Sequence, residues 1–127
     1  MENLEESINK KRSHEKSISL GEYINELMGK HGYETATELY TNAGISKQAF
    51  YKILSDTKYR PSLETMIRLA LALKLDSHEC KYLLKKASYT LASSSKFSLI
   101  IRYCIENEIY EIDKVNEILE KEGFEKI

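Results

Sequence analysis

The chain contains few of the residues that interrupt helices or cross-link secreted domains. One proline and five glycines among 127 residues permit helices along most of its length. Two cysteines are too few for a disulfide scaffold. The N-terminal residues lack the apolar segment of a signal peptide, so we expect reduced thiols and a cytoplasmic protein. No run approaches the roughly 20 apolar residues that span a bilayer, so we expect no membrane association.

The residue types that carry catalysis or bind metals are present but scattered. The three histidines, His14, His31 and His78, are far apart, and the sequence has no C-x-x-C or H-x-x-x-H pair. We therefore expect no metal site. The chain has no glycine-rich phosphate loop, and Ser93–Ser95 lack the context of a nucleophile elbow. These observations favour a protein that is not an enzyme and needs no cofactor.

The hydrophobic pattern predicts an all-α protein. Apolar residues make up 42% of the chain, which is enough for a compact core. Their spacing indicates five helices within residues 19–92 and two more within residues 93–127, with no strand pattern of useful length. Residues 1–18 hold only isolated large hydrophobic side chains and are expected to form a flexible N-terminal arm.

Charge is unevenly distributed along the chain. The total is −1, which by itself does not favour nucleic-acid binding. From Glu106 onward, eight acidic residues face three basic ones, a balance of −5. The preceding residues therefore carry +4, so the C-terminal segment is acidic and the rest of the chain is mildly basic.

The segment Ser46–Ser55 predicts an amphipathic helix with a basic outer face. Phe50, Ile53 and Leu54 recur at helical spacing and form the apolar side. The other side has two lysines, an amide and a phenol, and no acid: Lys47, Gln48, Tyr51 and Lys52. Such a helix fits the major groove of DNA, although a solvated outer face of an ordinary bundle helix explains the same pattern.

The residues before this helix predict a sharp turn between two short helices. Thr35 opens a helix that ends at Gly44, and Ser46 caps the next one. The glycine permits the positive φ that the turn requires, and Ile45 fills the corner. This arrangement is a helix-turn-helix at the level of sequence.

Residues 20–75 resemble the lambda-repressor-like, or XRE-type, DNA-binding domain. The resemblance rests on three groups of residues, which are Glu38-Leu39, Ala43–Ser46 with Phe50 and Ile53, and Pro61–Thr65 with Leu69, Ala70, Ala72 and Leu73. It implies a five-helix lambda-repressor-like bundle and a DNA-binding transcriptional regulator of bacterial or phage type. The remaining C-terminal part resembles a two-helix extension of bacterial standalone and macro-domain-associated helix-turn-helix proteins, and names no activity.

The same resemblance implies a set of contacts with double-stranded DNA. Bases would be contacted from the second motif helix by Lys47, Gln48, Tyr51 and Lys52. The amide of Gln48 matches N6 and N7 of adenine, and a lysine matches guanine or a phosphate. Phosphates would be bound at the start of the first motif helix and in the loop after the second, by Thr35, Thr37, Lys58, Tyr59 and Arg60.

Three features keep a second function open. Tyr40 stands where the family usually has a small residue, and Ala36 replaces a glutamine that binds phosphate. With the acidic C-terminal segment, these features favour a protein-interaction module, such as an adaptor or inhibitor. The two C-terminal helices also have two roles open, because they could mediate a homodimer or cover the apolar helix at residues 62–75 of their own chain.

Overall fold

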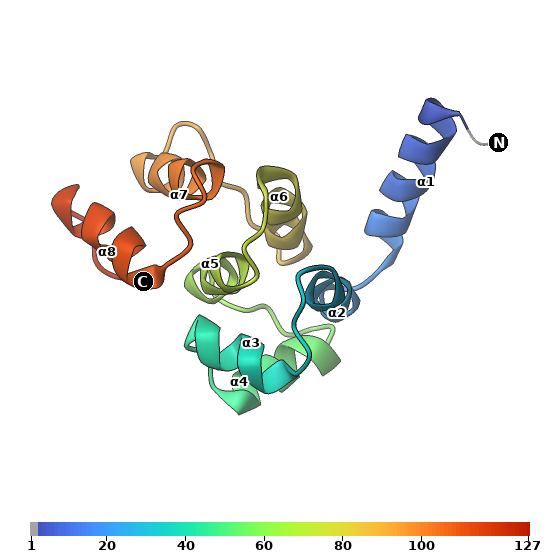
Figure 1. Cartoon of the computed structure of the whole chain (residues 1–127), viewed down its shortest axis with the longest axis horizontal. Coiled ribbons are helices and arrows are strands. Elements are labelled where there is room, and N and C mark those ends of the chain that lie inside the picture. Colours follow the sequence, from blue (N-terminus) through green and yellow to red (C-terminus); the bar gives the residue numbers. More distant parts are fainter. Residues whose placement is uncertain (1–2) are drawn as a thin grey trace.

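The computed structural model describes residues 3–127, except for the side chain of Lys16, and all regular structure in this part is helical. Its helices, in chain order, are α1 (Leu4–Ser17), α2 (Leu20–Lys30), α3 (Ala36–Ala43), α4 (Lys47–Ser55), α5 (Leu63–Ala72), α6 (Ser77–Lys86), α7 (Lys96–Glu106) and α8 (Ile112–Lys121). Figure 1 shows α2 to α6 gathered around α5, with α1 on one side and α7 and α8 on the other. This confirms the all-α fold with a five-helix bundle and two C-terminal helices.

Most helices begin where a short polar side chain caps them. A hydroxyl or carboxylate oxygen accepts a hydrogen bond from the backbone N–H three residues later, at Ser19, Thr35, Ser46, Ser62, Asp76 and Ser95. At the starts of α2 and α6, the carboxylates of Glu22 and Glu79 accept a hydrogen bond from the backbone N–H of the capping residue, which completes a capping box. The helix starts were therefore predictable from local sequence.

Helix α5 lies at the centre of the bundle, as its apolar sequence predicted. It packs against α3 and α6, and five of its ten residues are buried, which are Met66, Ile67, Leu69, Ala70 and Leu71. The helix ends at Ala72, and Lys74 adopts a positive φ of 55°. Helix α5 is thus shorter than the apolar stretch at residues 62–75. Leu73 and Leu75 belong to the turn that follows the helix, and both side chains are buried.

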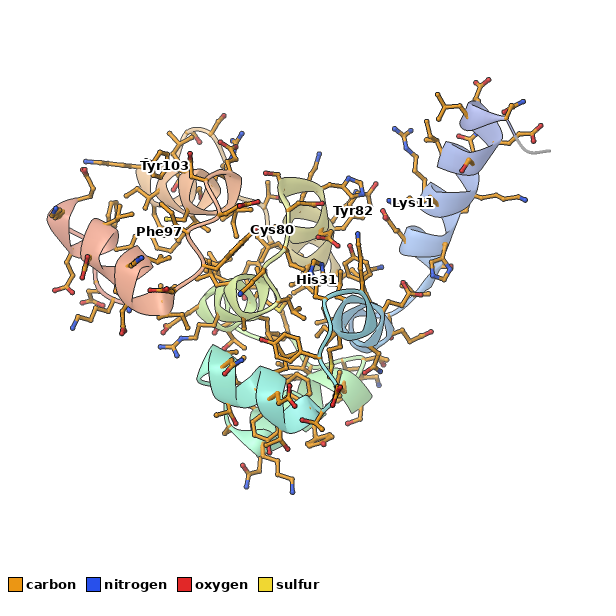
Figure 2. All side chains as sticks on the ribbon, viewed as in Figure 1. Lys11, His31, Cys80, Tyr82, Phe97 and Tyr103 are labelled. Carbon is orange, nitrogen blue, oxygen red and sulfur yellow. The ribbon has the colours of Figure 1, made fainter. Side chains whose placement is uncertain are left out.

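A buried carboxylate joins α2 to α6. Glu79 is 4% exposed and accepts hydrogen bonds from His31 at 3.0 Å and from the N–H of Asp76, and it pairs with Lys30 at 2.9 Å. In Figure 2, His31, the residue that follows α2, lies on the side of that helix towards α6. Burial raises the pKa of Glu79, but the hydrogen bonds from Lys30 and His31 outweigh it and lower the pKa to about 2.

Helix α1 was not indicated by hydrophobic periodicity. It occupies most of the predicted N-terminal arm, and residues 1 and 2 of that arm lie outside the described part of the chain. Its start is capped by Asn3, but Leu4 and Ile8 are 78% and 42% exposed. Near its end α1 is tied to the bundle, where the ammonium of Lys86 donates to the carbonyls of Glu15 and Ile18.

The C-terminal helices bury their apolar sides within the chain. Helix α7 packs against α6, and α8 packs against α7. Their buried side chains include Ile101, Cys104, Ile105, Val115 and Leu119. The amide of Asn116 holds the last residue, since it accepts from the N–H of Ile127 at 2.8 Å and donates to its carbonyl at 3.2 Å.

Candidate nucleic-acid interface

The turn between α3 and α4 has the geometry that the sequence predicted. Gly44 adopts φ 68° and its N–H donates to the carbonyl of Thr41, while the N–H of Ile45 donates to that of Tyr40 at 2.9 Å. These two bonds form a Schellman motif, which satisfies carbonyls that a helix end leaves unpaired. The turn therefore fixes the direction in which α4 leaves α3.

Two contacts from other helices hold this pair in place. Arg68 of α5 reaches the carbonyls of Ala43 and Gly44, each at 3.4 Å, so its charge lies at the C-terminal end of α3. Gly21 of α2 packs against α4 so closely that an added Cβ would lie 2.3 Å from the carbonyl oxygen of Leu54. The turn that precedes α4 and the end of α4 are therefore positioned by helices outside the motif.

Helix α4 is oriented with its apolar side inward and its polar start outward. Phe50 is fully buried and Ile53 is 4% exposed, whereas Lys47 and Gln48 are exposed. Neither of these two side chains has a hydrogen-bond or ion-pair partner within residues 3–127. Figure 1 shows α3 and α4 together at one end of the molecule, with α7 and α8 at another. The two C-terminal helices thus leave the start of α4 uncovered.

Tyr40 is accommodated by an aromatic cluster at the α3–α4 junction. Its ring lies 5.7 Å from that of Phe50 and 6.5 Å from that of Tyr51, and its hydroxyl is 3.3 Å from the hydroxyl of Thr37. The phenol is half-buried and satisfied, so the two helices accept a large side chain at this position. Tyr51 remains 44% exposed beside the basic face.

The loop after α4 contains two cations in different environments. The backbone N–H of Lys58 donates to the carboxylate of Asp56 at 3.0 Å, which shapes the turn and leaves the lysine side chain exposed. Arg60 is bound to its own chain. Its guanidinium donates to the carbonyls of Ala87 and Ser88 at 2.8 and 3.0 Å and lies 4.0 Å from the ring centre of Tyr89.

Lys52 and Tyr59 lie beside each other at the edge of the exposed face of α4. The Lys52 ammonium is 4.6 Å from the centre of the Tyr59 ring, a cation–π contact that orients the exposed lysine. At the start of α3, Thr35 accepts from the N–H of Glu38 at 3.3 Å, so its hydroxyl serves as the helix cap. The structure therefore brings Lys47, Gln48, Tyr51 and Lys52 together on α4, with Tyr59 beside Lys52.

Residues 23–79 match the family model described as the Cro/C1-type HTH DNA-binding domain. The chain contains a Cro/C1-type helix-turn-helix domain. The matched residues include α3, α4 and α5 in full. Comparisons with curated proteins and with solved structures gave no match.

Several residues that position α4 of this Cro/C1-type domain were not singled out from sequence. Arg68 is the one cation in an apolar helix, and such an isolated charge is a signal that sequence analysis could have used. The close approach of Gly21 carries no such signal, because glycine near a helix start has many explanations. Arg60 contacts Ala87 and Ser88, which directly follow α6 and lie 27 and 28 positions further along the chain, so only the tertiary structure reveals these contacts.

Proposed function

We propose that this protein is a sequence-specific transcriptional regulator that inserts α4 into the major groove of DNA. The Cro/C1-type domain supports a DNA-binding regulator in general. The observation that carries the finer proposal is the exposure of Lys47 and Gln48 in the first turn of α4, whose side chains have no hydrogen-bond or ion-pair partner within residues 3–127. Its opposite side, at Phe50 and Ile53, is buried in the bundle.

In this proposal each exposed group has a distinct role. Gln48 reads adenine through its amide, and Lys47 reads guanine or binds a neighbouring phosphate. Tyr51 contacts a base edge beside them. Lys52 and Lys58 bind phosphates, and the Tyr59 hydroxyl donates a hydrogen bond to a flanking phosphate. The first-turn N–H groups of α3, near Thr35 and Thr37, donate to a further phosphate. Arg60 is held by carbonyl groups and stabilises the loop rather than leading the contact.

A DNA titration with fluorescence anisotropy tests this proposal, using fragments first selected from genomic DNA. Three lysines at the interface predict that log K falls with log salt with a slope of up to about −3 per bound chain. The double change Lys47→Ala, Gln48→Ala should weaken specific binding about tenfold or more. The matched control Asn9→Ala, Lys121→Ala removes an amide and a lysine from α1 and α8 and should have little effect. Equal affinity of both double variants would refute the role of α4.

A second candidate function, protein–protein contact, concerns the C-terminal helices. Leu99 and Tyr103 lie one turn apart on α7 and are 45% and 54% exposed, next to the acidic segment. This face offers a contact for a partner protein or for a second copy of the chain. Sedimentation of wild type and the variant Leu99→Ser, Tyr103→Ser tests the homodimer. A protein adaptor becomes the better reading if no genomic fragment is selected at low salt while one partner co-purifies with wild type and not with this variant.

A further inference from the structure

A groove runs between α6 and α7, on a part of the molecule that the DNA-binding proposal does not use. Its volume is about 580 Å³, within the range of sites that hold small organic ligands. It is lined by the exposed side of α6, the connecting segment from Tyr89 to Ser93, and the residues Arg102, Ile105 and Glu106 of α7. Figure 1 shows that α6 and α7 lie away from α4, so an occupant of this groove would not meet the same DNA surface.

The rim of the groove is basic. Lys81 and Lys85 lie one turn apart on α6, and Arg102 lines the groove from α7. All three are exposed, and within residues 3–127 none of them has an ion pair or a side-chain hydrogen bond. Among the described lining residues Glu106 is the one carboxylate, so the groove has a local balance of +2 in a chain whose total is −1.

The floor of the groove is apolar. Leu84 and Cys80 of α6 are 1% and 3% exposed, and Ile105 of α7 is 3% exposed, while Leu91 adds an apolar side chain from the connecting segment. Figure 2 shows Cys80 on the side of α6 that faces α7. Burial raises the pKa of the Cys80 thiol to about 12, so this group adds no negative charge to the floor at neutral pH.

We propose that this groove binds a small amphipathic organic anion, with an acyl or aromatic body on the apolar floor and an acidic headgroup among Lys81, Lys85 and Arg102. A bare inorganic anion would leave the apolar floor unfilled. A neutral or cationic ligand would leave three cations without a partner. The combination of a basic rim, an apolar floor and a volume of this size therefore selects the amphipathic anion.

The proposal is tested by two-dimensional amide NMR of the full chain, titrated with sub-micellar decanoate. Saturable shifts are expected in α6, in residues 89–93 and at the end of α7. Butyrate should bind about tenfold or more weakly, because each buried methylene strengthens binding. Decyltrimethylammonium, which has the same chain length and the opposite charge, should give no saturable shifts there. Equal binding of decanoate and decyltrimethylammonium would overturn the headgroup assignment, and shifts confined to other helices would overturn the site.

A pair of triple variants gives the matched control. The groove variant Lys81→Gln, Lys85→Gln, Arg102→Gln should bind decanoate about tenfold more weakly. The control variant Lys47→Gln, Lys52→Gln, Lys58→Gln loses the same charge at the DNA surface and should bind decanoate like wild type. Wild-type affinity in the groove variant, or equal loss in both variants, would contradict the proposal. If the groove variant does not fold, the comparison of the two ten-carbon ligands on wild type decides.

Discussion

The contact between Gly21 and Leu54 provides a sharp test of how α4 is held. A Cβ at residue 21 would lie 2.3 Å from the Leu54 carbonyl oxygen and 3.0 Å from two further backbone atoms of the same residue. Backbone atoms cannot move aside as the end of a flexible side chain can. The substitution Gly21→Ala must therefore push the start of α2 and the end of α4 apart.

The same helix contains a matched control. Gly29 lies inside α2, and an added Cβ there meets nothing within 4 Å. Replacing glycine by alanine at such an exposed helical position stabilises a protein by roughly 0.5–1 kcal/mol, through helix propensity and a less flexible unfolded chain. Gly21→Ala should gain part of this term but lose about 1–3 kcal/mol through overpacking. The two identical substitutions are thus expected to change the free energy of unfolding in opposite directions.

Urea unfolding followed by circular dichroism measures both variants. For a chain of this size, 1 kcal/mol corresponds to a shift of roughly 3–6 °C in melting temperature, so thermal scans are a second readout. We also expect Gly21→Ala to weaken DNA binding more than Gly29→Ala, because it displaces α4. A Gly21→Ala protein as stable as Gly29→Ala would show that α2 and α4 do not approach this closely, and the positioning argument would fail.

Two further predictions concern a buried ion pair and the loop after α4. Because the pKa of Glu79 is lowered to about 2 in the folded state, its contribution to stability is present above about pH 4.5 and is lost as the pH falls towards 2. Wild type should lose on the order of 2–3 kcal/mol over this interval, and Glu79→Gln should lose less. Arg60→Ala should destabilise the fold by about 1–2 kcal/mol, whereas Lys58→Ala should leave unfolding unchanged and weaken DNA binding; the reverse pattern would exchange the roles of these two cations.

The helices of the bundle could be predicted from sequence because their signals are local. A capping side chain such as Ser46, an apolar repeat such as Phe50 and Ile53, and a glycine such as Gly44 act within a few residues of each other. Helix α1 escaped prediction because it lacks an apolar stripe, and its tie to α6 depends on Lys86, about 70 positions away. Helices specified by local patterns could therefore be predicted from sequence, whereas a helix held by a distant contact could not.

The candidate site was likewise predictable only where its features depend on local sequence. The orientation of Lys47 and Gln48 follows from the period of the helix, and the structure confirms that both are exposed. Arg60 was expected to bind phosphate because it is a cation in a flanking loop, but the structure gives its guanidinium two carbonyl partners and an aromatic ring. A loop cation and a structural cation look alike in sequence, since the partners that distinguish them come from a distant segment, here the residues that follow α6.

The separation of charge in the fold explains how a chain of net charge −1 can present a surface suited to DNA. Helix α4 lies at one end of the molecule, away from α8 (Figure 1), and the acidic residues are concentrated in the segment from Glu106 onward, which includes α8. In the field of a DNA duplex, such a distribution favours approach with α4 first and disfavours approach through the C-terminal helices. The acidic C-terminal segment would therefore contribute to orientation rather than oppose binding. It follows that neutralising Glu117 and Glu120 should increase non-specific DNA binding more than it increases specific binding.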